Sequence, residues 1–359
     1  MTHFKSILRK IIRPFFLFIY SFKKANLNRD HRGNPLQPGI TAVISMKDEE
    51  YTIALSIKSL LGIADQIICI DNGSEDESVN IVKNLIVELN GLIEIELHEM
   101  PNALLGDCRN FGLSRSKHQW HLRWDADMIS IKSGLNDMRY LRQLIHQQKS
   151  PAAIQFGYIN LNGDFNHTVI DHERSLGEPY LVFFNKDIFY QEIDKFDVIK
   201  LPKYFSIIST NRHLFFHCGG LKSDKNLIHR FHYFTWRKFT INDPKFNLSK
   251  EEFIRKRNLF LLNTTEDNNV KFRYQKQNVF RFIKYDVDNE VPFTEEILNL
   301  LRSEGKRFEV IYNNGRPVSR RDYNDQEMNQ FIPKEEDLNW DANIFFEKLK
   351  NESPSQYLD

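Results

Sequence analysis

The sequence has 359 residues, more than one minimal domain requires, so we expect one large α/β domain with an accessory region. The formal net charge is +1, so the chain as a whole lacks the positive field that nucleic-acid binding uses, and we expect no nucleic-acid partner. The three cysteines, Cys69, Cys108 and Cys218, have neither metal-ligand nor redox spacing, which indicates a reduced, cytosolic setting.

Residues 1–37 form a basic amphipathic arm, in which apolar residues recur at helical spacing and lysines and arginines follow another face. Pro14 predicts a kink or an end of the first helix. The apolar run 14–22 is too short for a bilayer, which takes about 20 residues. We expect the arm to bind the anionic, cytoplasmic face of a membrane as a peripheral anchor. The alternatives are a helix packed on the protein's own core and an oligomer contact.

Residues 38–128 alternate between apolar runs and amphipathic segments. The apolar runs predict strands at 39–46, 66–70, 93–97 and 119–124. The amphipathic segments predict helices at 51–61, 74–88 and 105–116, with Ser74 as the cap of the second. This order is typical of an α/β fold with a mostly parallel, doubly wound sheet and helices on both faces. No glycine-rich phosphate loop of either common type occurs.

Acidic residues follow the predicted strands. Glu49 comes after the first strand, Asp71 ends the second and Asp125 ends the fourth. Because the carboxyl ends of parallel strands meet at one edge of a sheet, we expect these residues to lie together. Asp125 and Asp127 stand two residues apart, so in a strand they point the same way and repel each other. A divalent cation such as Mg²⁺ or Mn²⁺ between them would relieve that repulsion.

Four motifs, at residues 43–50, 70–76, 109–112 and 124–127, occur in this order at natural spacings. They resemble the family 2 glycosyltransferases, inverting enzymes of the GT-A fold that use nucleotide-diphosphate sugars. The resemblance is strong over 38–128, weaker to about 240 and absent beyond. It departs in one detail, because many members carry Asn where this chain has Asp48.

The resemblance implies a nucleotide-binding role for residues of all four motifs: Ser45, Lys47, Glu49, Asp71, Ser74, Asp76, Arg109 and Asp125. The residues of the first motif would line the base and ribose pocket. Asp71 would accept a hydrogen bond from the base, and Arg109 would lie near the diphosphate. Asp127 would bind the metal, Mn²⁺ or Mg²⁺, directly, with Asp125 at the ribose or the metal's water shell.

Residues 129–240 are expected to form the acceptor half, with strands at 152–160, 180–185 and 213–220. An inverting transfer needs a base for the acceptor hydroxyl, and the candidates are Asp171, Glu173 and Asp224. Many relatives show a His-Glu pair where this chain has His217 and Cys218. The resemblance adds His217 and His232 as candidate contacts to the metal or the diphosphate. For each histidine the alternative is an ordinary core or surface imidazole.

Residues 241–359 are expected to form a mainly helical accessory region. Helices are predicted at 249–262, capped by Ser249, at 292–303 and at 341–351, and a short strand at 308–312. The residues preceding this region, 38–240, are then the catalytic domain.

These observations predict a metal-dependent, inverting glycosyltransferase. It would move a sugar from a nucleotide-diphosphate donor, a UDP-sugar, to a hydroxyl of a cell-surface glycan or lipid-linked acceptor of the lipopolysaccharide or capsule type. One alternative is a nucleotidyl or phospho-sugar transferase, but residues 47–50 are acidic where such enzymes carry glycine and basic residues. The other alternative is a sugar-binding module without catalysis on the same fold.

Overall fold

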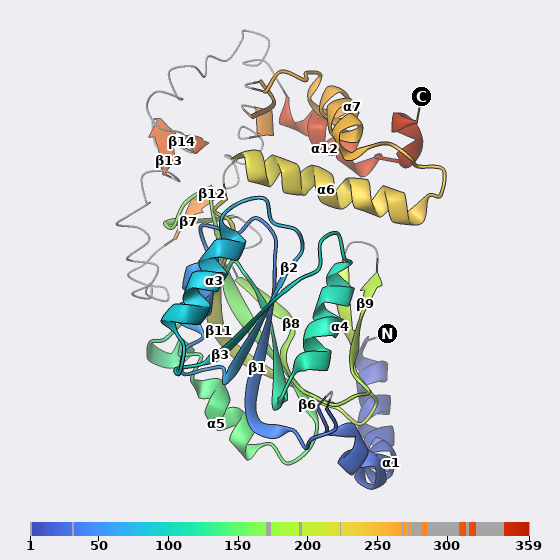
Figure 1. Cartoon of the computed structure of the whole chain (residues 1–359). Coiled ribbons are helices and arrows are strands. Elements are labelled where there is room, and N and C mark those ends of the chain that lie inside the picture. The colour runs from blue at the N-terminus through green and yellow to red at the C-terminus, as the bar shows by residue number, and fades with distance from the viewer. Residues whose placement is uncertain are drawn as a thin grey trace. The chain divides into compact units, whose positions relative to one another are not determined.

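The structure is a computed structural model of the chain (Figure 1). It describes residues 2–30, 32–169, 174–193, 196–222, 224–267, 269–271, 273–274, 282–285, 309–313, 316–320 and 341–358. The chain divides into two compact units. The first unit comprises residues 1–160, 174–218 and 291–297, and the second comprises 161–173, 219–290 and 298–359.

The first unit is built on an eight-stranded sheet of order β3-β2-β1-β4-β8-β6-β11-β5. Its parallel half is formed by β1 (Gln37–Met46), β2 (Gln66–Asp71), β3 (Glu94–Glu99) and β4 (His118–Asp125). These are the four strands that the apolar runs predict. Consecutive side chains of β1 face opposite sides of the sheet, and both sides are covered, so the strand reads as a continuous apolar run.

Helices cover both faces of the parallel half, which confirms the predicted fold class: α2 (Ile53–Ser59), α3 (Ser78–Glu88) and α4 (Leu105–Arg115). Ile44 belongs to the core under α2 and α3, whereas its neighbour Val43 packs with Cys108 of α4. The helix predicted from Ser74 begins four residues later, at Ser78. Ser74 is therefore not its cap, because its hydroxyl is engaged within the preceding loop.

The remaining strands of the sheet are β5 (Met128–Ser130), β6 (Ala152–Asn162), β8 (Arg174–Phe183) and β11 (Ser206–Gly220). β8 pairs antiparallel with both β4 and β6, and β11 pairs antiparallel with β5. A hairpin of β9 (Phe189–Ile193) and β10 (Phe196–Lys200), which no sequence pattern predicted, contacts α4. The short helix η1 (Gly134–Asn136) and α5 (Tyr140–Gln147) connect β5 to β6.

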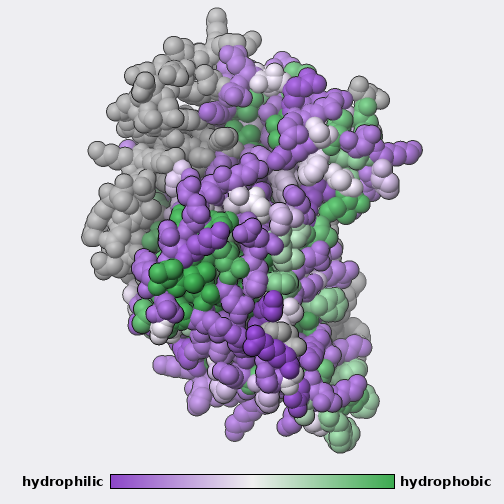
Figure 2. All heavy atoms as spheres, in the orientation of Figure 1, coloured by the Kyte–Doolittle hydropathy of each residue, from purple (hydrophilic) through white to green (hydrophobic). Residues whose placement is uncertain are grey.

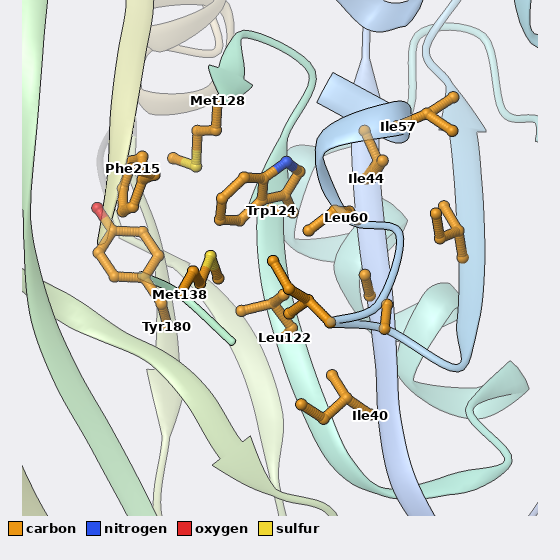
Figure 3. Close-up of a cluster of buried hydrophobic side chains, with 14 of the residues drawn as sticks. Ile40, Ile44, Ile57, Leu60, Leu122, Trp124, Met128, Met138, Tyr180 and Phe215 are labelled. Carbon is orange, nitrogen blue, oxygen red and sulfur yellow. The ribbon is translucent and has the colours of Figure 1, made fainter. Parts of the chain in front are cut away.

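The largest core includes side chains from both halves of the sheet, which pack against helices α2 and α3 (Figure 3). Trp124, at the end of β4, is fully buried beside Phe215 of β11, with ring centroids 5.2 Å apart. Its indole N–H donates to Ser56 Oγ of α2 at 2.9 Å. A buried indole that also satisfies its polar atom fixes both its neighbours, so Trp124 joins the end of β4 firmly to α2.

The first helix, α1 (Thr2–Leu27), runs through Pro14 without ending, so of the two outcomes predicted at that proline the helix end is wrong and the kink stays a prediction. The following turns are held in place because Phe16, Leu17 and Tyr20 pack in a core of the first unit with Leu36. In the part of the chain that the structure describes, no helix is long and apolar enough to cross a membrane.

The helices of the second unit include α6 (Asp224–Asn242), α7 (Lys250–Leu262) and α12 (Ala342–Lys350). Two short antiparallel sheets pair β7 (His167–Val169) with β12 (Phe282–Lys284) and β13 (Val310–Asn313) with β14 (Arg316–Arg320). The short helix η3 (Pro354–Tyr357) follows α12. Ser249 caps α7 as predicted, accepting a hydrogen bond from Glu252 N at 3.2 Å. The helix predicted at 292–303 lies outside the described residues.

Candidate active site

The loops that follow β1 and β2 are bonded to each other. Backbone N–H groups of the first loop donate to side chains of the second: Asp48 N to Ser74 Oγ (2.9 Å), Glu49 N to Ser78 Oγ (2.7 Å) and Glu50 N to Asp76 Oδ2 (3.0 Å). The side chain of Lys47, also in the first loop, donates from Nζ to the carbonyl of Gly73 in the second. Several polar residues that were predicted to bind the nucleotide are therefore engaged in holding these two loops together.

Asp48 occupies the left-handed region of backbone conformation, with φ of +54°. Asn and Asp tolerate this region better than other residues with a Cβ. This accounts for the one departure from the family pattern, because both residue types fit the same backbone.

Asp71 is 3% exposed, and both of its carboxylate oxygens accept hydrogen bonds from its own loop. The donors are Gly73 N at 2.9 Å, Ser74 N at 3.1 Å and Ser74 Oγ at 2.6 Å. This is the arrangement of a turn closed by an aspartate side chain. The contact of Asp71 with a nucleotide base stays a prediction.

Buried carboxylates lie at the carboxyl ends of β1 and β4. Glu49 is 8% exposed and Asp127 is 2% exposed. Burial raises the pKa of the Cys218 thiol well above its ordinary value, and the charges of Asp127 and Glu49 raise it further. Cys218 N also donates to Asp127 O at 2.7 Å. Both charges therefore act on the same thiol, and the two carboxylates follow neighbouring strands, β1 and β4.

Ser45 lies in the same region, near the end of β1. It pairs in register with Ile70 of β2 on one side and Asp125 of β4 on the other. Its hydroxyl oxygen is buried and makes no hydrogen bond to the residues that the structure describes. A buried hydroxyl in this state is costly, so Ser45 Oγ is suited to a partner supplied by a ligand.

Arg109 is fully buried in α4. Its guanidinium donates to the carbonyls of Val43 (3.2 Å) and Trp124 (2.8 Å) and pairs with Asp125 and, at 3.2 Å, with Asp197. All three guanidinium nitrogens are engaged inside the unit, where the side chain joins β1, β4 and β10. The position of Arg109 near the diphosphate stays a prediction.

A line of alternating charges runs from the surface to Asp125. Glu178 pairs with Arg123, Arg123 with Asp197 at 3.2 Å, and Asp197 with Arg109, which pairs with Asp125. Asp197 is 3% exposed and is the carboxylate shared by the two arginines. Sequence reasoning missed Asp197, because no pattern in residues 196–200 predicts a strand or reveals the two arginines that Asp197 contacts.

This line of charges sets the protonation of Asp125. Burial alone would raise the pKa of its carboxyl, but the nearby guanidinium groups of Arg109 and Arg123 outweigh burial and hold that pKa below its ordinary value. Asp125 therefore remains an anion throughout the neutral range, with its orientation fixed by Arg109.

His217 faces Asp127. Its Nε2 lies 3.4 Å from Asp127 Oδ1, and its Nδ1 lies 3.0 Å from Asn160 Oδ1. When Nδ1 carries the proton donated to Asn160, Nε2 directs a lone pair toward the carboxylate, which is unfavourable unless a proton or a metal cation lies between them. The donor set, one carboxylate and one oriented imidazole with Asp125 nearby, suits Mn²⁺ or Mg²⁺.

Among the residues that the structure describes, no group of three or more His, Cys, Asp and Glu side chains is arranged as a complete metal site.

The other candidates lie in the second unit. His232 is fully buried, with Nε2 at 2.8 Å from Asn258 Oδ1 and Nδ1 at 3.3 Å from an Arg257 nitrogen. Both ring nitrogens are thus engaged by α7, and the contact of His232 with the metal or the diphosphate stays a prediction. Asp224 is the first residue of α6. Asp171 and Glu173 lie outside the described residues.

Comparison with known proteins adds the family. Residues 41–138 match the model of Glycosyl transferase family 2. No curated protein matches the sequence. S. aureus TarS 1–349 in complex with UDP-GlcNAc is similar over 75% of this chain and 86% of its own, with 13% identity and a TM-score of 0.35. Glucosyl-3-phosphoglycerate synthase from Mycobacterium tuberculosis, in complex with Mn²⁺, UDP and phosphoglyceric acid, is similar over 33% of this chain and 43% of its own, with 16% identity and a TM-score of 0.26.

These two likenesses are too low for any residue to be transferred from either structure. The family match covers β1 to β4, which carry the loops and carboxylates described above, and the sheet has the mixed α/β arrangement of the GT-A fold. Residues 41–138 therefore form a family 2 glycosyltransferase domain, and the chain is a glycosyltransferase.

Proposed function

We propose that this enzyme is a metal-dependent, inverting glycosyltransferase that uses a UDP-sugar. Its acceptor would be a hydroxyl of a cell-surface glycan or a lipid-linked precursor, of the lipopolysaccharide or capsule type. The observation that carries the proposal is the pairing of His217 with the buried carboxylate of Asp127, which follows β4 within the residues that match family 2.

The nucleotide would bind along the loops after β1 and β2. Ser45 offers an unsatisfied hydroxyl, and the loop of Asp71, Ser74 and Asp76 forms the wall on which the base rests. Their bonds to the first loop fix that wall before the donor arrives. A preformed site of this kind lowers the ordering cost of binding.

Asp127 and His217 would hold Mn²⁺ or Mg²⁺. When bound, the cation supplies Lewis acidity that offsets the charge developing on the departing diphosphate. The chain's own residues would prepare that site. Asn160 orients His217, and Arg109, which pairs with Asp197, keeps Asp125 ionised and would direct it toward the ribose.

The acceptor hydroxyl must lose its proton as its oxygen attacks the anomeric carbon. Asp171, Glu173 and Asp224 remain the proposed bases, one of which would accept that proton. Replacing each in turn by its amide identifies the base, since the true base lowers transfer by about 100-fold or more while leaving donor binding unchanged.

The first test uses a panel of UDP-sugars that includes UDP-GlcNAc and UDP-glucose, screened by thermal shift with Mn²⁺. A true donor raises the melting temperature by mass action, because it binds only the folded state. Release of UDP from that donor is then measured. A chain that binds the donor but releases no UDP with any acceptor is the sugar-binding module. Formation of UTP and sugar 1-phosphate from the UDP-sugar and added pyrophosphate identifies the nucleotidyl transferase.

Asp127→Asn tests the role of the site itself. We expect it to lower UDP release by about 100-fold or more, as loss of a charge-stabilising group does. Asp107→Asn, at an exposed position of α4, is the matched control and should leave the rate unchanged. Full activity of Asp127→Asn with an intact fold would refute the assignment.

We further propose that residues 1–37 place the enzyme peripherally on the cytoplasmic face of a membrane. An anionic bilayer surface would attract the positive charge of this segment, and a lipid-linked acceptor would be presented there.

A further inference from the structure

The described part of α1 has two apolar faces that differ in what covers them. Tyr20 is 7% exposed and stacks on Tyr204, with ring centroids 4.6 Å apart. Phe15, Phe18 and Phe22 are 64%, 64% and 72% exposed. Their spacing of three and four residues places them on one side of the helix. Figure 2 shows hydrophobic side chains at the surface where α1 lies in Figure 1.

Three exposed phenylalanines in one row are unusual for a surface in water, because large apolar patches on soluble proteins mark interaction sites. The rings of Phe18 and Phe22 pack edge to face at 4.9 Å, so they form one continuous surface. The inward face is already covered by the first unit, which means that the outward face is not required for folding.

The charge of α1 indicates what covers the outward face. Residues 2–27 contain six lysines and arginines and no Asp or Glu. Lys23 and Lys24 are exposed directly after Phe22. A second copy docked face to face would bring two such positive segments together, since an isologous interface sets a patch against itself. An anionic lipid surface instead offers negative headgroups beside an apolar layer.

We propose that Phe15, Phe18 and Phe22 insert into the acyl boundary of an anionic bilayer, with Lys23 and Lys24 at the headgroups and α1 parallel to the membrane plane. The inference deepens the membrane partner of the proposed function and rests on it, but it is independent of the transfer chemistry. It assigns binding to one helix face.

α1 is fixed to the unit that it would anchor. The guanidinium of Arg13 donates to Tyr204 O and Ser150 Oγ, each at 3.1 Å. Tyr20 OH donates to Asn28 Oδ1 at 3.0 Å. Because the inward face is bonded in this way, insertion of the outward face would hold the first unit in a defined orientation on the membrane.

The test is flotation of the full chain with vesicles of phosphatidylcholine, with and without about 30% phosphatidylglycerol. We expect binding to the anionic vesicles only, and a loss of at least about tenfold in partitioning for the triple variant Phe15→Ser, Phe18→Ser, Phe22→Ser. The variant Lys23→Glu, Lys24→Glu should weaken binding to anionic vesicles as well.

Val87→Ser with Leu92→Ser is the matched control, because both residues are exposed and apolar, at 78% and 74%, but lie away from α1. This control should bind as the wild type does. Equal binding of the triple variant and the wild type overturns the proposal, as does a wild-type dimer in light scattering that the triple variant dissociates.

Release of UDP in solution separates this inference from the proposed function. The triple variant should retain donor hydrolysis, because its three side chains lie outside the site. A wild type that binds vesicles but hydrolyses no donor would refute the transfer function and leave the membrane face supported.

Discussion

At the scale of single residues, the site depends on charges that are buried together. Asp197 is the middle of the line that ends at Asp125, and it contacts two guanidinium groups with its two oxygens. A buried ion pair contributes little net stability when complete, but removing one partner is costly because the other charge is left without compensation. Asp197 should therefore act on both stability and the site.

Asp197→Asn keeps the shape and removes the charge. We expect a loss of about 3 kcal/mol in the free energy of unfolding, because Arg109 and Arg123 then lose the negative charge that both of them pair with. Urea denaturation measures this loss. Donor hydrolysis should also fall at temperatures where the variant is folded, since Arg109 no longer orients Asp125.

Glu178→Gln is the control at the other end of the line. Glu178 is 50% exposed, so the change should cost less than about 1 kcal/mol and leave hydrolysis unchanged. If the two substitutions had equal effects on stability and hydrolysis, the buried Asp197 would contribute no more than the exposed Glu178. That result would contradict the positioning role of Asp197.

Sequence reasoning located the carboxylates better than it assigned their roles. Glu49, Asp125 and Asp127 follow predicted strands, and parallel topology alone brings such residues to one edge. The buried contacts of Arg109 and His232 could not be predicted, because their partners are distant in the sequence: Asp197 is 88 residues from Arg109, and Asn258 is 26 residues from His232. A pattern along the chain does not reveal a partner across the fold.

At the scale of elements, the parallel strands could be predicted because each is an apolar run bounded by polar loops. The hairpin of β9 and β10 could not, because its role is to cover α4 rather than to continue the pattern. Helix α6 was also missed, since its aromatic and basic residues follow no clear single face. In both cases the element is defined by what it packs on.

Gly112 shows how closely α4 approaches β1. A Cβ at this position would lie 2.3 Å from Val43 Cγ1 and 3.2 Å from Ile70 Cδ1. Gly112→Ala should cost about 1–3 kcal/mol by overpacking, although alanine favours a helix. Differential denaturation measures the loss.

Ser114→Ala, at an exposed position of the same helix, should change the stability by no more than about 0.5 kcal/mol. If Gly112→Ala were as stable as the wild type, α4 would not sit as closely on the sheet as described, and the position of Arg109 would be open to question.

At the scale of the whole molecule, each unit contains a histidine held neutral by burial. Burial, with nearby arginines, lowers the pKa of His121 to about 3 and that of His232 to about 3. The unfolded chain binds these protons below its own pKa of about 6.5, whereas the folded chain does not. Stability is therefore full above that value and falls with decreasing pH.

The expected loss is about 1.4 kcal/mol per pH unit for each histidine between pH 6.5 and 3. Urea midpoints at pH 7 and pH 5 measure it. His121→Asn should reduce the difference between the two midpoints, whereas His146→Gln, at an exposed position of α5, should not. If His121→Asn left the difference between the midpoints at pH 7 and pH 5 unchanged, His121 would not be a group that takes up a proton on unfolding.

The central claim is that Asp127 and His217 hold a divalent cation, which binds the diphosphate of the donor. Titration calorimetry of UDP into the wild type and Asp127→Asn, each with Mn²⁺ and with EDTA, tests it most directly. We predict that Mn²⁺ tightens UDP binding to the wild type by at least about tenfold, worth about 1.4 kcal/mol, and has no effect in the variant. Equal UDP affinity in Mn²⁺ and EDTA, or equal tightening in both proteins, would contradict the claim.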